Sequence, residues 1–164
     1  MHRLGIGMVA IVLVIALSVF CSGSFAESQG QALIDAAKKG DLEQIRDLLA
    51  QGADVNANNG GDETALQHAA WNGNLEVVKV LIDNGADVNA TCVTGLTVLM
   101  SAVQGGRNLD IVTLLVGKGA DTKARYSDGH TVLMAAAWGG NLDVVKILIE
   151  KASASTPEVR TATR

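Results

Sequence analysis

One three-residue motif recurs along this sequence at almost constant spacing. Gly-Ala-Asp stands at Gly52–Asp54, Gly85–Asp87 and Gly119–Asp121, so the steps are 33 and then 34 residues. Two further markers keep the same phase: Thr-x-Leu at Thr64/Leu66, Thr97/Leu99 and Thr131/Leu133, and Asp-Leu or Asn-Leu pairs starting at Asp41, Asn74, Asn108 and Asn141. A fixed period of this size, carried by three markers, predicts a solenoid of stacked units.

The most regular copy of the unit covers residues 62–90. It contains Thr-Ala-Leu-Gln-His-Ala-Ala, then Gly-Asn-Leu-Glu-Val-Val-Lys-Val-Leu-Ile, then Asn-Gly-Ala-Asp-Val-Asn-Ala. These segments resemble the ankyrin repeat, and the resemblance covers about residues 30–152. It implies an all-α fold, a solenoid of four helix-turn-helix units with connecting β-hairpin loops. The family's usual Thr-Pro-Leu-His is Thr-Ala-Leu-Gln or Thr-Val-Leu-Met here, so the proline that preorganises the first helical turn is missing.

The repeat register divides the chain into segments. We expect a repeat domain over residues 27–152, with units at about 31–59, 62–92, 95–126 and 129–152, followed by a disordered polar tail at 153–164. A polar lead-in at 27–30 is expected before the first unit, whose first helix is expected at 32–39. The third unit has one extra residue in the turn between its helices, which explains the step of 34.

Helix caps can also be predicted. Asp41 and Asn74 stand where an N-cap is wanted, Thr64 and Gln67 fit a capping box, and Gly85 suits the left-handed end of a helix. Met100 and Met134 recur at helical core positions and are interpreted as packing residues.

The first 26 residues have the pattern of a secretory signal peptide. Arg3 precedes an apolar run at Ile6–Phe20, and Ser24 and Ala26 match the small residues before a cleavage site. The alternative is a retained anchor helix, but the run is shorter than the roughly 20 apolar residues that a membrane span needs. We therefore expect cleavage after Ala26 and a periplasmic or secreted protein that has no membrane contact afterwards.

Composition limits the classes of partner. The net charge is −4, or −5 once Arg3 is removed with the leader, and no basic run occurs. Such a surface disfavours nucleic acid and anionic membranes as partners. The two cysteines, Cys21 and Cys92, exclude a disulfide framework. Cys92 is expected at an exposed hairpin tip, where it is either a tolerated thiol or the site of an intermolecular disulfide.

No set of residues with catalytic or cofactor-binding spacing is found. A nucleophile with a base, paired acids and a phosphate-binding loop are all missing from the sequence. His68 and His130 have no second ligand at metal-binding spacing, so we interpret them as ordinary histidines. The chain is expected to be a monomer without enzymatic activity, cofactor or metal.

Candidate binding residues come from the positions that vary while the repeat frame stays constant. By resemblance to related ankyrin proteins, three positions line the concave face: the position after the Ala-Ala pair, the position before the capping threonine, and the hairpin position four residues further back. Tryptophan and tyrosine dominate binding hot spots, so the aromatic members stand out. The alternative is that each tryptophan packs on the turn of its own unit. The candidates by resemblance are Lys38, Glu63, Trp71, Leu96, Gln104, Tyr126, His130 and Trp138.

The resemblance implies that the chain binds another protein. The favoured function is a non-catalytic interaction module of the bacterial cell envelope that acts as an adaptor or stabiliser. Two alternatives remain open at this point: a secreted effector that engages host proteins, and an inhibitor or immunity protein that occludes an enzyme.

Overall fold

The computed structural model describes residues 27–105 and 108–154. This part of the chain forms helices joined by loops and turns, with no extended strand. A helix over residues 27–39 comes first, and the others are α2 (Leu42–Ala50), α3 (Ala65–Asn72), α4 (Leu75–Asp83), α5 (Val98–Gln104), α6 (Leu109–Gly117), α7 (Val132–Trp138) and α8 (Leu142–Ala154). The predicted all-α solenoid is confirmed.

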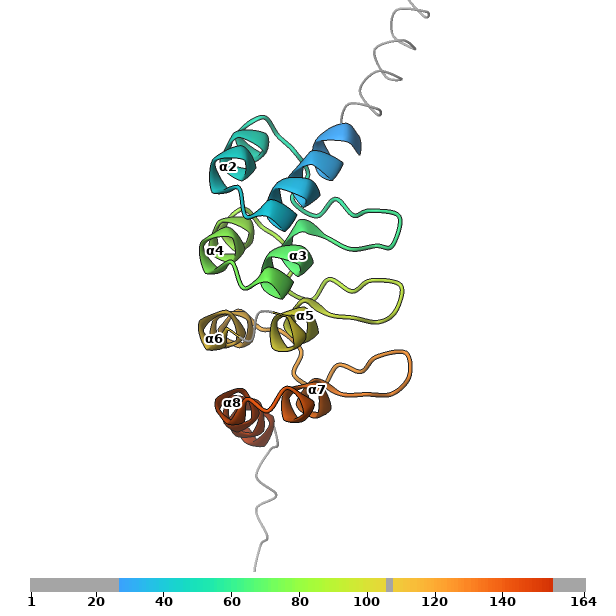
Figure 1. Ribbon diagram of the computed structural model, residues 1–164, viewed down its shortest axis with the longest axis vertical. Coiled ribbons are helices and arrows are strands. Elements are labelled where there is room, and N and C mark those ends of the chain that lie inside the picture. The colour runs from blue at the N-terminus through green and yellow to red at the C-terminus, as the bar shows by residue number, and fades with distance from the viewer. Residues whose placement is uncertain (1–26, 106–107, 155–164) are drawn as a thin grey trace, which may run out of the picture.

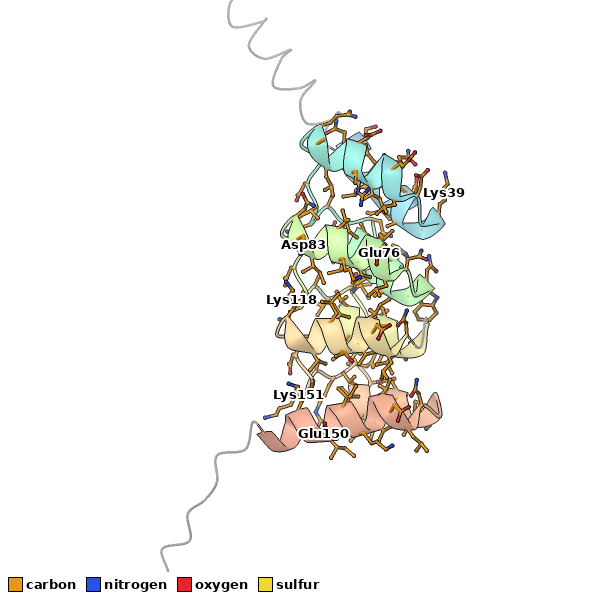
Figure 2. All side chains as sticks on the ribbon, turned by 90° about the vertical axis from the view of Figure 1, so that its left-hand side faces the viewer. Lys39, Glu76, Asp83, Lys118, Glu150 and Lys151 are labelled. Atoms are coloured by element: carbon orange, nitrogen blue, oxygen red, sulfur yellow. The ribbon has the colours of Figure 1, made fainter. Side chains whose placement is uncertain are left out.

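The helices stand in two columns along the long axis of the molecule (Figure 1). Helices α2, α4, α6 and α8 form the outer column, and each packs on the next one. Helices α3, α5 and α7 continue the inner column that the helix at 27–39 begins, and three loops project from its side (Figure 1). Figure 2 looks onto the outer column, whose exposed side carries charged residues such as Glu76, Asp83 and Lys118.

The boundaries of the repeat array differ from those expected at both ends. The expected polar lead-in at 27–30 is already helical, so the first helix begins before the predicted residue 32. At the other end α8 runs to Ala154, past the expected boundary at residue 152. The predicted signal peptide, most of the predicted tail and residues 106–107 of the third turn lie outside the described residues.

Threonine caps start three inner helices. The Thr64 side chain accepts a hydrogen bond from the Gln67 backbone N–H, and the Gln67 side chain accepts one from the Thr64 N–H, which confirms the capping box. Thr97 and Thr131 cap α5 and α7 in the same way, but methionine stands where the reciprocating glutamine would be. Each of these two caps therefore satisfies one backbone N–H fewer than the capping box of Thr64 and Gln67 does.

The predicted caps of the outer helices had different outcomes. Asp41 accepts from the Gln44 backbone N–H and caps α2 as expected. Asn74 is the N-cap residue of α4 as expected, but its side chain makes no cap hydrogen bond. Its amide lies over Gly40 of the preceding unit, where a Cβ built on the glycine would be 2.7 Å from Asn74 Nδ2. Gly85 has the predicted left-handed conformation, with φ of 88°, one residue after the Asn84 C-cap.

The core is a continuous aliphatic stack. Small alanines of the inner helices let neighbouring units approach closely, and leucine, isoleucine and valine fill the space between the columns. Met100 belongs to this core, but Met134 at the equivalent position is 49% exposed. The predicted packing role of Met134 was therefore wrong, because no described unit follows α7 and α8 to cover it. The buried large residues include Leu33, Ile34, Ile45, Leu66, Val78, Leu81, Leu99, Ile111, Val112 and Leu115.

Asparagines after the Gly-Ala-Asp motifs connect consecutive units. Asn56 donates to the Gly85 carbonyl at 3.2 Å and accepts from the Asp87 N–H at 2.8 Å. Asn89 makes the same pair of bonds to Gly119 and Asp121, at 3.2 and 2.8 Å. The motif therefore recurs because each turn is hydrogen-bonded to the turn of the next unit.

The projecting loops are hairpins closed by a single antiparallel bridge each. The bridges join Asn58 to Thr64, Thr91 to Thr97, and Arg125 to Thr131. Cys92 was expected to be exposed at the second hairpin, but its side chain is buried, with Sγ 3.0 Å from Thr94 Oγ1. Among the described residues, no helix is both long and apolar enough to cross a membrane.

Candidate protein-binding surface

A pocket of about 300 Å³ lies on the inner column between the second and third units. The loops contribute Glu63 and Leu96, each directly before a capping threonine, and α3 contributes Trp71. The structure thus brings together three of the residues selected from the sequence. The remaining lining residues are Gln67, His68 and Ser101.

Hydrogen bonds fix the walls of this pocket. The Gln67 amide closes the capping box of α3 and also donates from Nε2 to the Leu96 carbonyl at 2.7 Å, so it ties the second unit to the hairpin that leads into the third unit. The Glu63 carboxylate accepts from Asn59 Nδ2 at 2.9 Å. A partner would therefore meet a preorganised surface and would pay little entropy to order these side chains.

The pocket is apolar with one acid at its edge. His68 Nε2 lies 3.3 Å from Glu63 Oε2 at an ion-pair distance, although its orientation does not make a hydrogen bond. Burial lowers the pKa of His68 below its usual 6.5, and the nearby Lys38 charge lowers it further, against the raising effect of Glu63. His68 is therefore neutral at pH 7, and the half-exposed Glu63 carboxylate supplies the charge of the pocket.

The last unit forms a separate aromatic cluster. The His130 and Trp138 rings are 4.8 Å apart between centroids, at an interplanar angle of 58°. His130 Nδ1 is 2.7 Å from Asp128 Oδ2, and Asp128 also accepts from the His130 backbone N–H. These hydrogen bonds lower the pKa of Asp128. The imidazole is thereby held beside an indole that is 73% exposed.

Tyr126 lies closer to the core than the sequence suggested. Its ring packs against the buried residues, and its hydroxyl is buried with no hydrogen-bond partner among the described residues. Burial, with smaller contributions from Asp128 and Cys92, raises the pKa of Tyr126 to about 12. The ring thus supports the third hairpin, and its hydroxyl is not offered to a partner.

Lys38 and Gln104 are exposed at the ends of their inner helices, in the same repeat position as the two tryptophans. Lys38 Nζ lies 3.9 Å from Asp35, an exposed pair whose contribution to stability is small. Neither residue lines the pocket at Trp71.

Trp71 packs on the turn of the following unit. A Cβ built on Gly105 would lie 2.7 Å from carbons of the Trp71 ring, so the glycine makes room for the indole. The ring still keeps 46% of its surface exposed. Trp71 therefore combines a structural contact with an accessible face.

The family-model comparison agrees with this architecture. A model described as Ankyrin repeats (3 copies) matches residues 33–126 and 92–161. The chain belongs to the ankyrin-repeat family. Ankyrin repeats are generally protein-protein interaction modules and are typically non-catalytic.

One relative shows how far the ankyrin likeness extends. A human protein named mitochondrial disaggregase is 42% identical over 64 residues. The aligned part is 39% of this chain and 9% of that protein. The similarity therefore covers less than half of this chain and a small part of the relative's length.

Three pocket residues of this ankyrin surface were not selected from the sequence. Gln67 had been assigned only to the capping box, His68 was treated as an ordinary histidine, and Ser101 was not considered. His68 and Ser101 occupy the same repeat position, which reads Asp35, His68, Ser101 and Ala135 through the units. That variation in polarity is the signal that singled out the tryptophan position, and it would have identified this position too.

A larger pocket of about 620 Å³ lies at the N-terminal end of the ankyrin array. It contains none of the predicted binding residues and no aromatic side chain. Because aromatic anchors carry most hot-spot energy, the smaller pocket is the better candidate. The larger one is lined by Glu27, Gln31, Asp54, Asn56, Ala57, Asn58, Asn59 and Gly60.

Proposed function

We propose that this ankyrin-repeat protein is a non-catalytic adaptor or stabiliser that binds one partner protein in the bacterial cell envelope. Residues 1–26 direct its export, and the periplasm is its place of action. The single observation that supports a binding role most strongly is the preorganised pocket formed by Glu63, Trp71 and Leu96.

The chemistry of the pocket indicates the kind of contact it makes. An apolar side chain of the partner enters beside the indole of Trp71 and the Leu96 side chain. A lysine, arginine or free amide of the partner then meets the Glu63 carboxylate, which Asn59 holds in place. Burial of such a charge-assisted hydrogen bond next to an apolar anchor gives both affinity and orientation.

The test is partner capture with matched variants of the exported chain. Glu63→Gln removes the charge but keeps an acceptor for Asn59, and Leu96→Ala shortens the apolar side chain that lines the pocket with Trp71. Glu76→Gln is the control, since it makes the same change on the outer column (Figure 2). We expect one periplasmic protein to bind the wild type and Glu76→Gln and to be lost with the other two variants.

Further measurements separate the related functions. An increased lifetime of the captured protein identifies a stabiliser, and loss of its activity identifies an inhibitor. Equal capture by all variants would place binding elsewhere on the surface. An empty capture, with the chain recovered outside the cell, would instead support an effector role. N-terminal sequencing of the exported chain, expected to start at Glu27, tests the signal peptide.

A further inference from the structure

Exposed large apolar side chains are concentrated at the C-terminal end of the solenoid. Of the seven that the described residues present, five belong to the last unit and only Trp71 and Val93 lie elsewhere. Surface apolar residues are normal when scattered, but a cluster on one face indicates an interaction site. We call the part of this cluster that a following unit would cover the end face, and it consists of Leu133, Met134, Leu142 and Ile149.

The repeat register explains why the end face is exposed. Leu133 is 40% exposed, whereas Leu66 and Leu99 at the same position are each 1% exposed. In the second and third units this side of the repeat is covered by the unit that follows. The end face is therefore a stacking surface without a described neighbour, and polar residues have not replaced its apolar ones, as the terminal cap of a repeat array would require.

The N-terminal end of the array has the opposite character. Neither the helix at 27–39 nor α2 exposes a large apolar side chain. The exposed residues there include Gln31, Asp35, Glu43, Arg46 and Asp47. A head-to-tail contact between copies would press the apolar end face onto this polar surface and bury its charges without partners, which is costly. Open-ended stacking of copies is therefore disfavoured.

The residues after α8 are a poor cover for the end face. Residues 155–164 read Ser-Thr-Pro-Glu-Val-Arg-Thr-Ala-Thr-Arg, with Val159 as the single large apolar residue. This composition supplies few apolar side chains that could pack against the end face. The same face of a second copy does match, because apolar side chains then meet apolar side chains on both sides.

We propose that two copies of this chain associate through their end faces in a two-fold dimer. A two-fold contact is isologous, so one apolar patch is sufficient for both partners. The rim of the face carries both signs of charge on α8, at Asp143 and Lys146, which lie 3.3 Å apart within one copy. Two-fold packing allows such residues to pair with opposite charges across the rim. This differs from the monomer expected from the sequence.

The size of the face sets the strength of the dimer. Two helices side by side, each about 10 Å wide, offer roughly 400 Å² per copy, or about 800 Å² over both copies, which is below the total of about 1,200 Å² that stable interfaces bury. The dimer is therefore weak and reversible, with a dissociation constant in the micromolar range.

Sedimentation velocity of the exported chain over a concentration series, with reductant present, tests the proposal. We expect concentration-dependent dimerisation that Leu133→Glu weakens at least about tenfold, because two carboxylates would be buried at the interface. Leu142→Glu is the second variant, since its exposed side chain can change without loss of the fold. Val93→Glu is the control: it is an equally exposed apolar residue on a hairpin, and it should leave dimerisation unchanged.

Three outcomes would overturn the dimer. If the wild-type chain remains monomeric at about 300 µM, far above a micromolar dissociation constant, the proposed interface does not exist. If Val93→Glu reduces association as much as Leu142→Glu does, the copies associate through another surface. If association appears only after residues 155–164 are deleted, the chain's own tail, and not a second copy, occupies the end face. Glu63→Gln should not change dimerisation, so this result is independent of partner binding.

Discussion

Trp71 and Gly105 are in contact across the boundary between the second and third units. The carbonyl oxygen and the indole of Trp71 lie against the glycine in the turn of the next unit. A Cβ on that glycine would clash with the Trp71 carbonyl oxygen and would also lie 2.7 Å from two carbons of the ring. The contact couples the most prominent candidate binding residue to the stacking of the units. It also means that substitutions at Trp71 affect both stability and binding.

Gly105→Ala should destabilise the fold by about 1–3 kcal/mol, since the new methyl group overpacks against Trp71. Urea unfolding with tryptophan fluorescence measures the loss and reports the displaced ring. Gly139→Ala is the control at the same repeat position, where a Cβ would make only ordinary contacts, at 3.4 Å or more. Equal stability of the two variants would show that the indole moves aside without cost.

Asn89→Ala should cost about 1–2 kcal/mol, because it removes two hydrogen bonds between the second and third turns. Lys123 occupies the same repeat position in the third unit, so Lys123→Ala serves as the control and should change stability by less than about 0.5 kcal/mol. Thermal melts of both variants test this difference. A neutral Asn89→Ala would mean that water replaces the lost bonds.

His68 should make the protein less stable as the pH falls. Its pKa is lowered in the folded state, chiefly by burial and then by Lys38, whereas the unfolded chain binds the proton near pH 6.5. Below that pH the unfolded state therefore gains protons first, and stability declines. Urea unfolding at about pH 7.5 and 5.5 should show a smaller decline for His68→Gln than for the wild type. The same decline in both proteins would contradict this role.

Cys92 should react slowly with a thiol reagent in the native protein, because its side chain is buried beside Thr94. Reaction rates with Ellman's reagent, in a Cys21→Ser background, should rise steeply once urea unfolds the chain. The native chain should also form no intermolecular disulfide during oxidation in air. Immediate, stoichiometric reaction of the folded protein would show that the hairpin opens readily.

Tyr126→Phe should be neutral or stabilise the fold by up to about 1 kcal/mol, since it removes a buried hydroxyl that has no partner in the described structure. Thermal melts measure the stability. Partner capture should be unchanged, because the hydroxyl is not accessible. A clear loss of stability would indicate that water or a residue outside the described part satisfies this group.

Several features could be predicted from residue positions because they depend on local chemistry. The capping box of Thr64 and Gln67, the Asp41 cap and the left-handed Gly85 each involve neighbours within a few residues. Asn74 did not follow its local preference, because its side chain is drawn over Gly40 of another unit. Cys92 was misplaced for the same reason: its burial depends on packing around the hairpin that sequence spacing does not show.

The amino-acid sequence by itself determined the repeat, its period and the all-α solenoid, because regular spacing of apolar and turn residues leaves few other ways to bury a core. Only the tertiary structure decided which repeated positions are buried or exposed. Met100 and Met134 occupy the same repeat position, yet one is in the core and the other lies on the end face. The physical reason is that burial in a solenoid depends on the next unit, and the last described unit has none.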